Sequence, residues 1–495
     1  MKHAYSARNI GRSALWSICN QSLGQLLVFA VFLVTARFVS KEAFGIMATA
    51  LFAVELFRQI FIESIGTTFL SKQAPSADDY NAGFFIILVG GALSALILFA
   101  FAGPIAEAFD NSHMATSLRW ISLLLLTTGL SKMHEVWLTK HLQFKSLAIR
   151  SVSSVCIGGA VGIFMAIEGC GIDSLIAQQI VTGVVGLVWL WSACEWRPAL
   201  RVRRNNVTSI IRYSRFVSLN SIASMLSTQG DVLLSSFYLG PAATGVYNAA
   251  KRLMTAAMLV ISSGLNSVAL PAQAAFADDV SSSQRSYLRC VGFTAILTAP
   301  LFAGLAALSL DVIELLMGQK WLDAAPVLAI LAVTGFNRSI EQYSGNVLLI
   351  RHKAHWLTTI GFVNAAVNVG ILFIFARYGL ISLAAAFTAK TLLMSPVPTR
   401  IALRLLDLSA SAYLRRIGPP LLVSLAMAAF IAMARNALRL NAISNIALFV
   451  PLGALFYAAL LCLFDRDAFR EGLAFLQKVT GKSAIAQPPN LADTP

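Results

Sequence analysis

Charged side chains are scarce in this sequence: Asp, Glu, Lys and Arg make up 12% of its 495 residues, against about 25% in soluble globular domains. Hydrophobic residues account for 57% of the chain, and the mean hydropathy is +0.72. So little charge cannot cover the surface of a soluble protein of this length, which excludes the soluble globular class. The composition is typical of a polytopic membrane protein.

Cysteine and histidine are also few, and neither has the spacing of a metal site or a catalytic site. The six cysteines lie in or beside apolar segments without CxxC or Cys/His spacing, and the six histidines form no cluster. Such cysteines are typical of inert buried thiols. HExxH, GxSxG and Walker sequences are absent, and no connection between apolar segments is long enough for a catalytic domain. The sequence therefore predicts no catalytic residues, no metal and no cofactor.

Acidic residues are outnumbered by basic ones, with 23 Asp and Glu against 38 Lys and Arg and a formal charge of +15. Twenty-five of the 38 basic residues fall in every second connection, six fall in the opposite connections, and seven fall within apolar segments. This asymmetry is the positive-inside bias, which predicts that both chain termini are cytoplasmic. It also excludes nucleic acid as a partner, because a nucleic-acid-binding surface gathers its basic residues on one face.

Long apolar runs are what the sequence does contain, and about fourteen of them could cross a bilayer as helices. We therefore expect an all-α polytopic membrane protein with about 14 transmembrane helices. The segments lie near residues 13–37, 44–64, 82–102, 117–139, 149–166, 174–193, 217–237, 242–270, 291–310, 324–350, 356–376, 381–401, 420–434 and 446–464.

One short pattern occurs twice inside these segments, at a separation of 206 residues. Each copy has Thr-Gly, then a cation, then an acid three residues after the cation: Thr128-Gly129, Lys132 and Glu135, and Thr334-Gly335, Arg338 and Glu341. A cation and an acid at this spacing lie on one face of a helix. Matching charged pairs in two halves of a membrane protein indicate a duplicated bundle around a shared polar interior.

A second match, at an offset of 200 residues, pairs Gly45 with Gly245 and supports the duplication. Six helices per half is an even number, so both halves enter the membrane in the same orientation, and their symmetry axis should lie along the membrane normal. We expect the repeated charged pairs to coincide when the halves are superposed. The predicted units are an N-terminal lobe over 1–204, a C-terminal lobe over 205–408, and two further helices with a cytoplasmic tail over 409–495.

Charges within the apolar segments are the candidate functional residues, because each costs about 2.5–3.5 kcal/mol unless it faces a partner or water. Seven cations stand against five acids, and a mildly cationic cavity suits an anionic ligand such as a diphosphate. The predicted substrate-binding residues are Arg58, Lys132, Lys251, Arg252, Arg338 and Lys390. The predicted coupling or cavity acids are Glu55, Glu63, Glu135, Asp231 and Glu341.

Two interpretations of these charges stay open. Each acid–base couple could bind a ligand or could equally be a structural ion pair between helices, in which the two charges neutralise each other. The acids of the repeated pattern fit the structural role, because each lies beside a cation. Asp231 and Glu63 have no basic residue three or four positions away on their own helix. Because desolvation favours the protonated form of a carboxyl group, these two are the preferred coupling acids.

Three short stretches carry a family signature. They are residues 36–40, which read ARFVS and precede Phe44-Gly45, residues 138–148, which read LTKHLQFKSLA, and Tyr378-Gly379-Leu380 before an alanine-rich helix. These stretches resemble the polysaccharide transporter family, within the superfamily of multidrug, oligosaccharidyl-lipid and polysaccharide exporters. The resemblance covers about residues 10–405. It implies an inner-membrane flippase with two six-helix lobes, which moves an undecaprenyl-diphosphate-linked oligosaccharide to the periplasmic leaflet by alternating access.

The resemblance implies a role in lipopolysaccharide or exopolysaccharide biosynthesis, with the lipid-linked oligosaccharide and the bilayer as partners. It leaves open contacts with polysaccharide polymerase and chain-length machinery. Two alternatives are an ion-coupled exporter of drugs or peptidoglycan precursors, which we expect to have a less cationic cavity, and a membrane-embedded glycan-modifying enzyme. Without a nucleotide site, an ion gradient or the membrane potential must supply the energy.

Overall fold

The structure is a computed structural model that describes residues 7–73, 75–199, 204–275, 279–438, 440–466 and 469–470. Within these ranges every regular element is a helix, which confirms the predicted all-α class. The α-helices are α1 (Ala7–Phe38), α2 (Lys41–Arg58), α3 (Ser64–Ser71), α4 (Ala77–Ala100), α5 (Ala102–Ala108), α6 (Ser112–Lys140), α7 (Phe144–Ile167), α8 (Ile172–Ala193), α9 (Arg204–Ala275), α10 (Val280–Ala307), α11 (Ser309–Met317), α12 (Ala324–Ile350), α13 (Ala354–Phe375), α14 (Leu380–Met394), α15 (Pro396–Leu405), α16 (Ala410–Leu438) and α17 (Ala442–Phe464).

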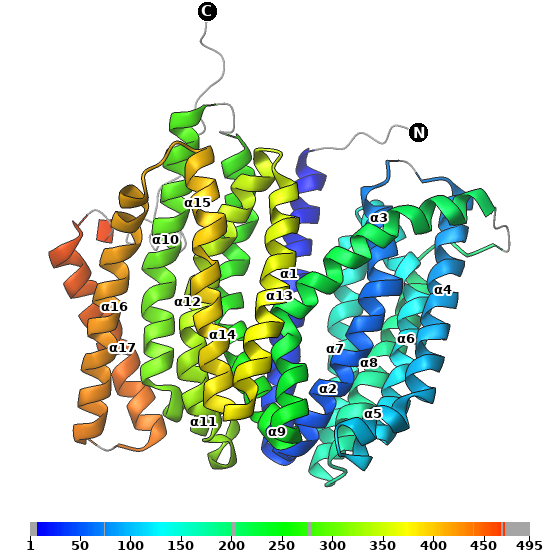
Figure 1. Ribbon diagram of the computed structural model, residues 1–495, viewed down its shortest axis with the longest axis horizontal. Helices are drawn as coiled ribbons and strands as arrows, with labels where there is room; N and C mark the ends of the chain where they lie inside the picture. The colour runs from blue at the N-terminus through cyan, green and yellow to red at the C-terminus, as the bar shows by residue number, and fades with distance from the viewer. Residues whose placement is uncertain are drawn as a thin grey trace, which may run out of the picture.

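The helices stand in two groups side by side (Figure 1). We call α1–α8 the N-terminal group and α9–α15 the C-terminal group, and α9 contacts both. Helices α16 and α17 pack on α10 and α11, against the C-terminal group. Helix α1 begins and α17 ends on the same side, the upper side of Figure 1, and the opposite side is called the lower side. The predicted lobe boundaries at 204/205 and 408/409 stay a prediction.

Nine helical segments among the described residues are long and apolar enough to span a membrane. The protein is therefore a multi-pass membrane protein. Helices α1, α6, α9 and α12 are also long but are not among the nine. The last three of these carry most of the candidate charges, as expected for helices that face a polar interior. The count of fourteen crossings stays a prediction.

Helix α9 contains both of the helices expected at 217–237 and 242–270. The run Arg204–Ala275 is broken at Gly240, whose backbone is not helical, so it consists of two helices that meet there. Gly240 has a φ of 78°, which glycine adopts without the steric cost of a Cβ atom. The difference from the prediction is that the first helix begins already at Arg204, and its early turns pack on the N-terminal group. Oγ of Ser214 lies 3.0 Å from Oγ1 of Thr68 on α3.

The second membrane segment contains a turn of π-helix that the sequence did not predict. The segment was expected at 44–64, but α2 starts at Lys41, capped by Ser40, and continues through the π-helix Gln59–Glu63 into α3. The carbonyl of Ile60 in this turn accepts hydrogen bonds from Ser64 at 2.7 Å and from Ser218 of α9 at 2.9 Å. Single π-turns are frequent at functional sites, and this one lies between two of the candidate acids.

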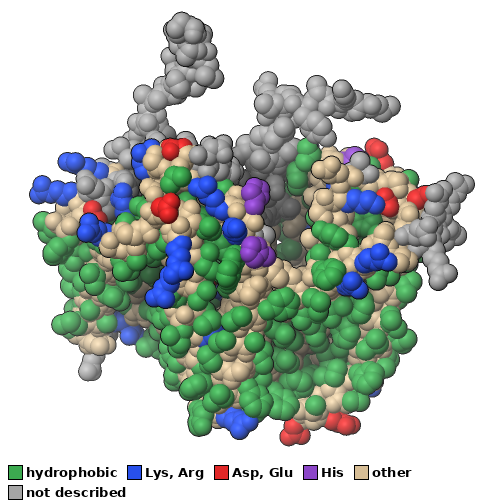
Figure 2. Space-filling view, turned by 45° about the horizontal axis from the view of Figure 1, so that its top comes forward, with side chains coloured by type: hydrophobic (Ala, Val, Ile, Leu, Met, Phe, Trp, Pro, Cys, Tyr) green, Lys and Arg blue, Asp and Glu red, His purple; other side chains and the backbone are tan. Residues whose placement is uncertain are grey.

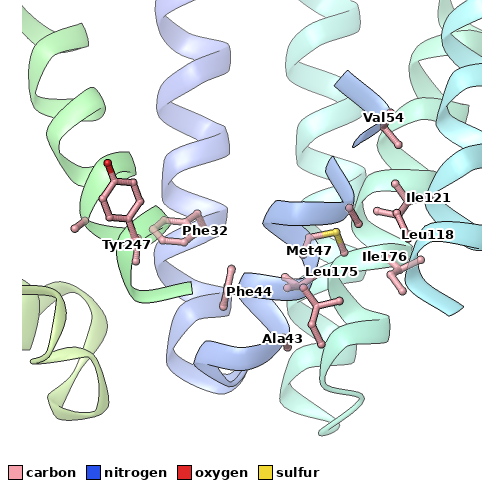
Figure 3. Packing of buried hydrophobic residues seen from close by; sticks show 14 of the residues in the cluster. Phe32, Ala43, Phe44, Met47, Val54, Leu118, Ile121, Leu175, Ile176 and Tyr247 are labelled. Atoms are coloured by element: carbon pink, nitrogen blue, oxygen red, sulfur yellow. The ribbon is translucent and has the colours of Figure 1, made fainter. Parts of the chain in front are cut away.

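The largest hydrophobic core runs through both helix groups without a break. Phe44 of α2 packs edge-to-face on Phe32 of α1, with ring centres 5.4 Å apart, and on Trp321, with ring centres 5.6 Å apart. Figure 3 shows Phe32 and Phe44 next to Tyr247 of α9, at the junction of the two groups. Edge-to-face aromatic pairs add to burial energy, so this junction is a well-packed contact.

Helices α16 and α17 are joined to the C-terminal group by a buried charge. Asp311 on α11 is 3% exposed. Its Oδ2 lies 2.6 Å from Nε of Arg435 on α16, and its Oδ1 accepts a hydrogen bond of 2.7 Å from Nδ2 of Asn445 on α17. One carboxylate therefore links three helices.

Replacing Arg435 by Ala should destabilise the protein by about 3–5 kcal/mol, because the buried Asp311 charge loses its partner. The measurement is the thermal unfolding of purified protein in detergent. Arg415→Ala, at an exposed position on the same helix, is the matched control and should unfold at the parent temperature. Equal unfolding temperatures for the two variants would show that the carboxylate does not fasten α16.

Candidate functional site

A network of ion pairs occupies the interior of the N-terminal group. Nζ of Lys132 lies 2.7 Å from Oε2 of Glu63 and 3.2 Å from Oε1 of Glu135. Glu135 also receives Arg150, at 3.5 Å between Oε2 and Nη1. The methylenes of Lys132 run beside Gly66, where a Cβ atom would contact them. The network thus connects the π-turn of the second membrane segment to α6 and α7.

A second acid–base pair lies one turn before the π-helix. Nη2 of Arg58 is 2.6 Å from Oε2 of Glu55, and Glu55 also accepts a 2.6 Å hydrogen bond from Gln59. Within the N-terminal group, each of the candidate cations therefore has a carboxylate partner.

The C-terminal group contains a fully buried carboxylate, Asp231, held between the two halves of α9. Nζ of Lys251 lies 2.7 Å from its Oδ1 and 2.6 Å from its Oδ2. The hydroxyl of Tyr247 donates to Oδ2 at 2.6 Å. Lys251 also donates to the carbonyl of Thr228 at 2.6 Å. Because charge and hydrogen bonds are satisfied, this buried pair is a stable arrangement.

Three predicted substrate-binding cations of the C-terminal group have no carboxylate partner among the described residues. Lys390 is 3% exposed, and its Nζ lies 3.5 Å from the carbonyl of Ser227. The guanidinium of Arg252 lies 4.9 Å from the ring centre of Phe32 on α1. Arg338 is half-buried and forms no ion pair in the described part of the chain.

Glu341 lines a cavity of about 330 Å³ between α12, α15 and the start of α16. Asn337, Arg400 and Tyr413 also line this cavity. The charges of Arg338 and Lys390 act on Glu341, but no ion pair joins Glu341 to Arg338. The pairing expected from the repeated pattern is thus present for Lys132 and Glu135 and absent from the second copy.

The two preferred coupling acids are both paired, although neither has a basic residue nearby on its own turn of helix. Asp231 contacts Lys251 from the far half of α9, and Glu63 contacts Lys132 from α6. Spacing along one helix could not reveal these partners, because they come from other segments. Tyr247 and Arg150, which complete the two clusters, were not predicted for the same reason.

The two helix groups close against each other on the lower side. Trp321 donates to the carbonyl of Ala36 at 2.8 Å, and Lys320 donates to those of Arg37 and Val39, each at 2.9 Å. Arg37 in turn donates to the carbonyl of Leu315 at 2.7 Å. A cation from the other helix group therefore contacts the carbonyls at the end of α1 and at the end of α11. Positive charge is stabilising at a helix C-terminus, where the helix dipole is negative.

The closure also includes a contact between backbones. A Cβ atom at Gly45 would overlap the carbonyl of Pro241, and one at Gly245 would overlap the carbonyl of Lys41. Lys41 itself forms an ion pair with Asp323. The upper side is different: Figure 2 brings it forward and shows a hollow between the two groups.

No group of three His, Cys, Asp or Glu side chains in the described ranges is arranged to hold a metal ion. Chemically, the site offers ion pairs, unpaired cations and backbone carbonyls. Such groups bind and release charged ligands.

Comparison with known proteins identifies the family. Residues 34–326, more than half of the chain, match the family described as "Polysaccharide biosynthesis protein". The chain belongs to this family. It is 28% identical over 335 residues to the succinoglycan biosynthesis transport protein ExoT of Rhizobium meliloti (strain 1021), covering 68% of each chain. It is 25% identical over 422 residues to the teichuronic acid biosynthesis protein TuaB of Bacillus subtilis (strain 168), covering 82% of this chain and 86% of TuaB.

Among solved structures, the chain is similar to the lipid II flippase MurJ in an inward closed conformation. The TM-score is 0.75 at 15% sequence identity, over 92% of this chain and 99% of MurJ. At this identity the likeness shows the fold alone. This fold agrees with the fold implied by the sequence.

Proposed function

We propose that this protein moves an undecaprenyl-diphosphate-linked oligosaccharide from the cytoplasmic to the periplasmic leaflet of the inner membrane, for lipopolysaccharide or exopolysaccharide biosynthesis. The family match supports this function, as do relatives named for succinoglycan transport and for teichuronic acid biosynthesis. No catalytic step is part of the proposal. Polysaccharide polymerase and chain-length machinery stay proposed partners.

The observation that carries the proposal is the excess of buried and half-buried cations beside the junction of the two helix groups. Among the described candidate residues, Arg252, Arg338 and Lys390 lack a carboxylate partner. Unpaired charge inside a membrane is costly, and a passing anionic cargo neutralises it. A diphosphate-linked glycan is such a cargo, whereas a cationic drug is not.

Alternating access follows from the contrast between the two sides. We propose that the upper side faces the cytoplasm, with both termini, and that the cargo enters the hollow there. The lower side then faces the periplasm, where the closure around Gly45 and Gly245 must open to release the cargo. In this proposal the lobes are residues 1–204 and 205–408, related by rotation about the membrane normal, with Lys132 falling on Arg338.

The proposed function is tested by deleting the gene and analysing lipid-linked oligosaccharides by mass spectrometry. The expected result is accumulation of a complete repeat unit on undecaprenyl diphosphate at the cytoplasmic face, because synthesis continues while translocation stops. Expression of the parent sequence should reverse the accumulation. Accumulation of an incomplete or unmodified repeat unit would point instead to a glycan-modifying enzyme.

A second prediction concerns the lower closure. Lys41→Cys and Asp323→Cys, combined in a variant without other cysteines, can be bridged by a short bifunctional methanethiosulfonate reagent. Bridging should stop translocation in proteoliposomes, because the two helix groups can no longer separate, and reduction should restore it. Either single-cysteine variant with the same reagent is the control. Undiminished translocation by the bridged protein would show that this closure does not need to open.

A third prediction concerns energy coupling. Moving one charge through 100 mV is worth about 2.3 kcal/mol, and protonation of Asp231 or Glu63 would release its lysine partner. Asp231→Asn and Glu63→Gln should therefore lose the stimulation of transport by an imposed pH gradient in inverted vesicles. Thermal unfolding in detergent checks that the variants are folded. Folded variants that respond to gradient and potential as the parent does would exclude both residues from coupling.

A further inference from the structure

The N-terminal group balances its buried charges internally. Its ion pairs are Arg58–Glu55, Lys132–Glu63, Lys132–Glu135 and Arg150–Glu135. Three cations thus face three acids in this cluster. An anion that entered would compete with carboxylates that already hold these cations, so the cluster offers it little net attraction.

The C-terminal group has cations left over. Both oxygens of Asp231 are taken by Lys251. Arg338 and Lys390 form no ion pair with any described residue, and Lys390 is almost completely buried. Nζ of Lys390 has a backbone carbonyl, that of Ser227, at 3.5 Å. A neutral carbonyl compensates a buried ammonium group only in part, so the site favours an added anion.

Arg338 and Lys390 lie on adjacent helices. Oγ1 of Thr334, one turn before Arg338 on α12, donates to Oγ1 of Thr388 on α14 at 3.0 Å. Nζ of Lys390 lies 5.2 Å from the ring centre of Phe387, as does Nζ of Lys251. Asn368, fully buried on α13, donates to a carbonyl of α9 and keeps its Oδ1 without a partner. Helices α12 and α14 therefore present two positive charges beside α9, and Glu341 of α12 is the acid on which both charges act without forming an ion pair.

The predicted duplication accounts for this difference. At the offset of 206, Arg338 corresponds to Lys132, so both halves have kept a cation on this helix. At the offset of 200, Ser263 stands where the first half has Glu63, the acid nearest to Lys132. The second half has therefore kept the cation and has no acid at the position of Glu63, while Glu341 still stands at the position of Glu135. Because Arg338 forms no ion pair with Glu341, its charge stays available to an anion.

We infer that the anionic headgroup of the cargo is held on one side only, by Arg338 and Lys390 of the C-terminal group. This inference rests on the proposed function and narrows its binding site from six cations to two. An anion could come from the lipid diphosphate or from acidic sugars. The forked guanidinium of Arg338 beside a lysine suits phosphate oxygens, and we assign the site to the diphosphate.

The test is binding of farnesyl diphosphate to the purified full chain in nanodiscs, measured by calorimetry at low salt. We expect Arg338→Gln and Lys390→Gln each to weaken binding about tenfold or more, since each removes a charge-assisted contact. Arg415→Gln is the matched control, because it also replaces a cation by glutamine but at an exposed position on α16, and it should bind within about twofold of the parent.

Stability gives an independent readout. Removing an unpaired cation should leave the thermal unfolding temperature of Arg338→Gln and Lys390→Gln unchanged or raised. Lys132→Gln should lower it, because Glu63 loses its lysine partner and Glu135 keeps only Arg150. A purely structural role for Arg338 and Lys390 predicts the opposite pattern, with lost stability accompanying lost binding.

The inference is overturned if Lys132→Gln loses farnesyl diphosphate binding while Arg338→Gln and Lys390→Gln keep it. It is also overturned if an uronic-acid oligosaccharide, and not farnesyl diphosphate, is the probe that these two variants fail to bind. Both results leave the proposed function intact. A parent protein that binds neither probe would count against the proposed function itself.

Discussion

The contact between Gly45 and Gly245 is the constraint on which the arrangement of the two helix groups depends. Helix α2 and the second half of α9 approach so closely that a Cβ atom on either glycine would overlap a carbonyl of the other group. The contact is reciprocal, since Gly45 meets Pro241 and Gly245 meets Lys41. Gly245 lies 200 residues after Gly45, and Pro241 lies 200 residues after Lys41. Contacts between equivalent positions are what a two-fold relation produces, so the contact supports the proposed symmetry of the lobes.

Around this near-symmetric contact the buried charges are not symmetric. The first half surrounds Lys132 with acids, whereas the second half pairs Asp231 with Lys251 and leaves Arg338 without a carboxylate. If both helix groups carried an anion site, they would hold the cargo equally. Separation of the two groups would then break half of the contacts between protein and cargo. Binding to one helix group lets the other group move while the cargo stays attached, which suits alternating access.

The sequence predicted the elements that depend on local pattern. The segment expected at 324–350 has the bounds of α12, and Lys132 pairs with Glu135 as their spacing indicated. The pairs Glu63–Lys132 and Asp231–Lys251 could not be predicted, because each joins segments whose relative rotation is set by packing. The π-turn also depends on tertiary contacts: the carbonyl of Ile60 is satisfied by Ser218, which lies far along the chain.

In the orientation that we propose, the cations on the lower side run against the positive-inside bias, and each described one makes a specific contact. Arg37 and Lys320 cap helix ends, Lys41 pairs with Asp323, and Arg435 pairs with Asp311. Arg377 lies over aromatic rings at 5.0 and 5.5 Å. A basic residue on the translocated side opposes insertion of the chain into the membrane. Such a residue is therefore expected where it makes a contact that stabilises the folded protein. Three of these five cations form the lower closure, so in the proposed orientation the exceptions to the charge bias lie at the surface that opens.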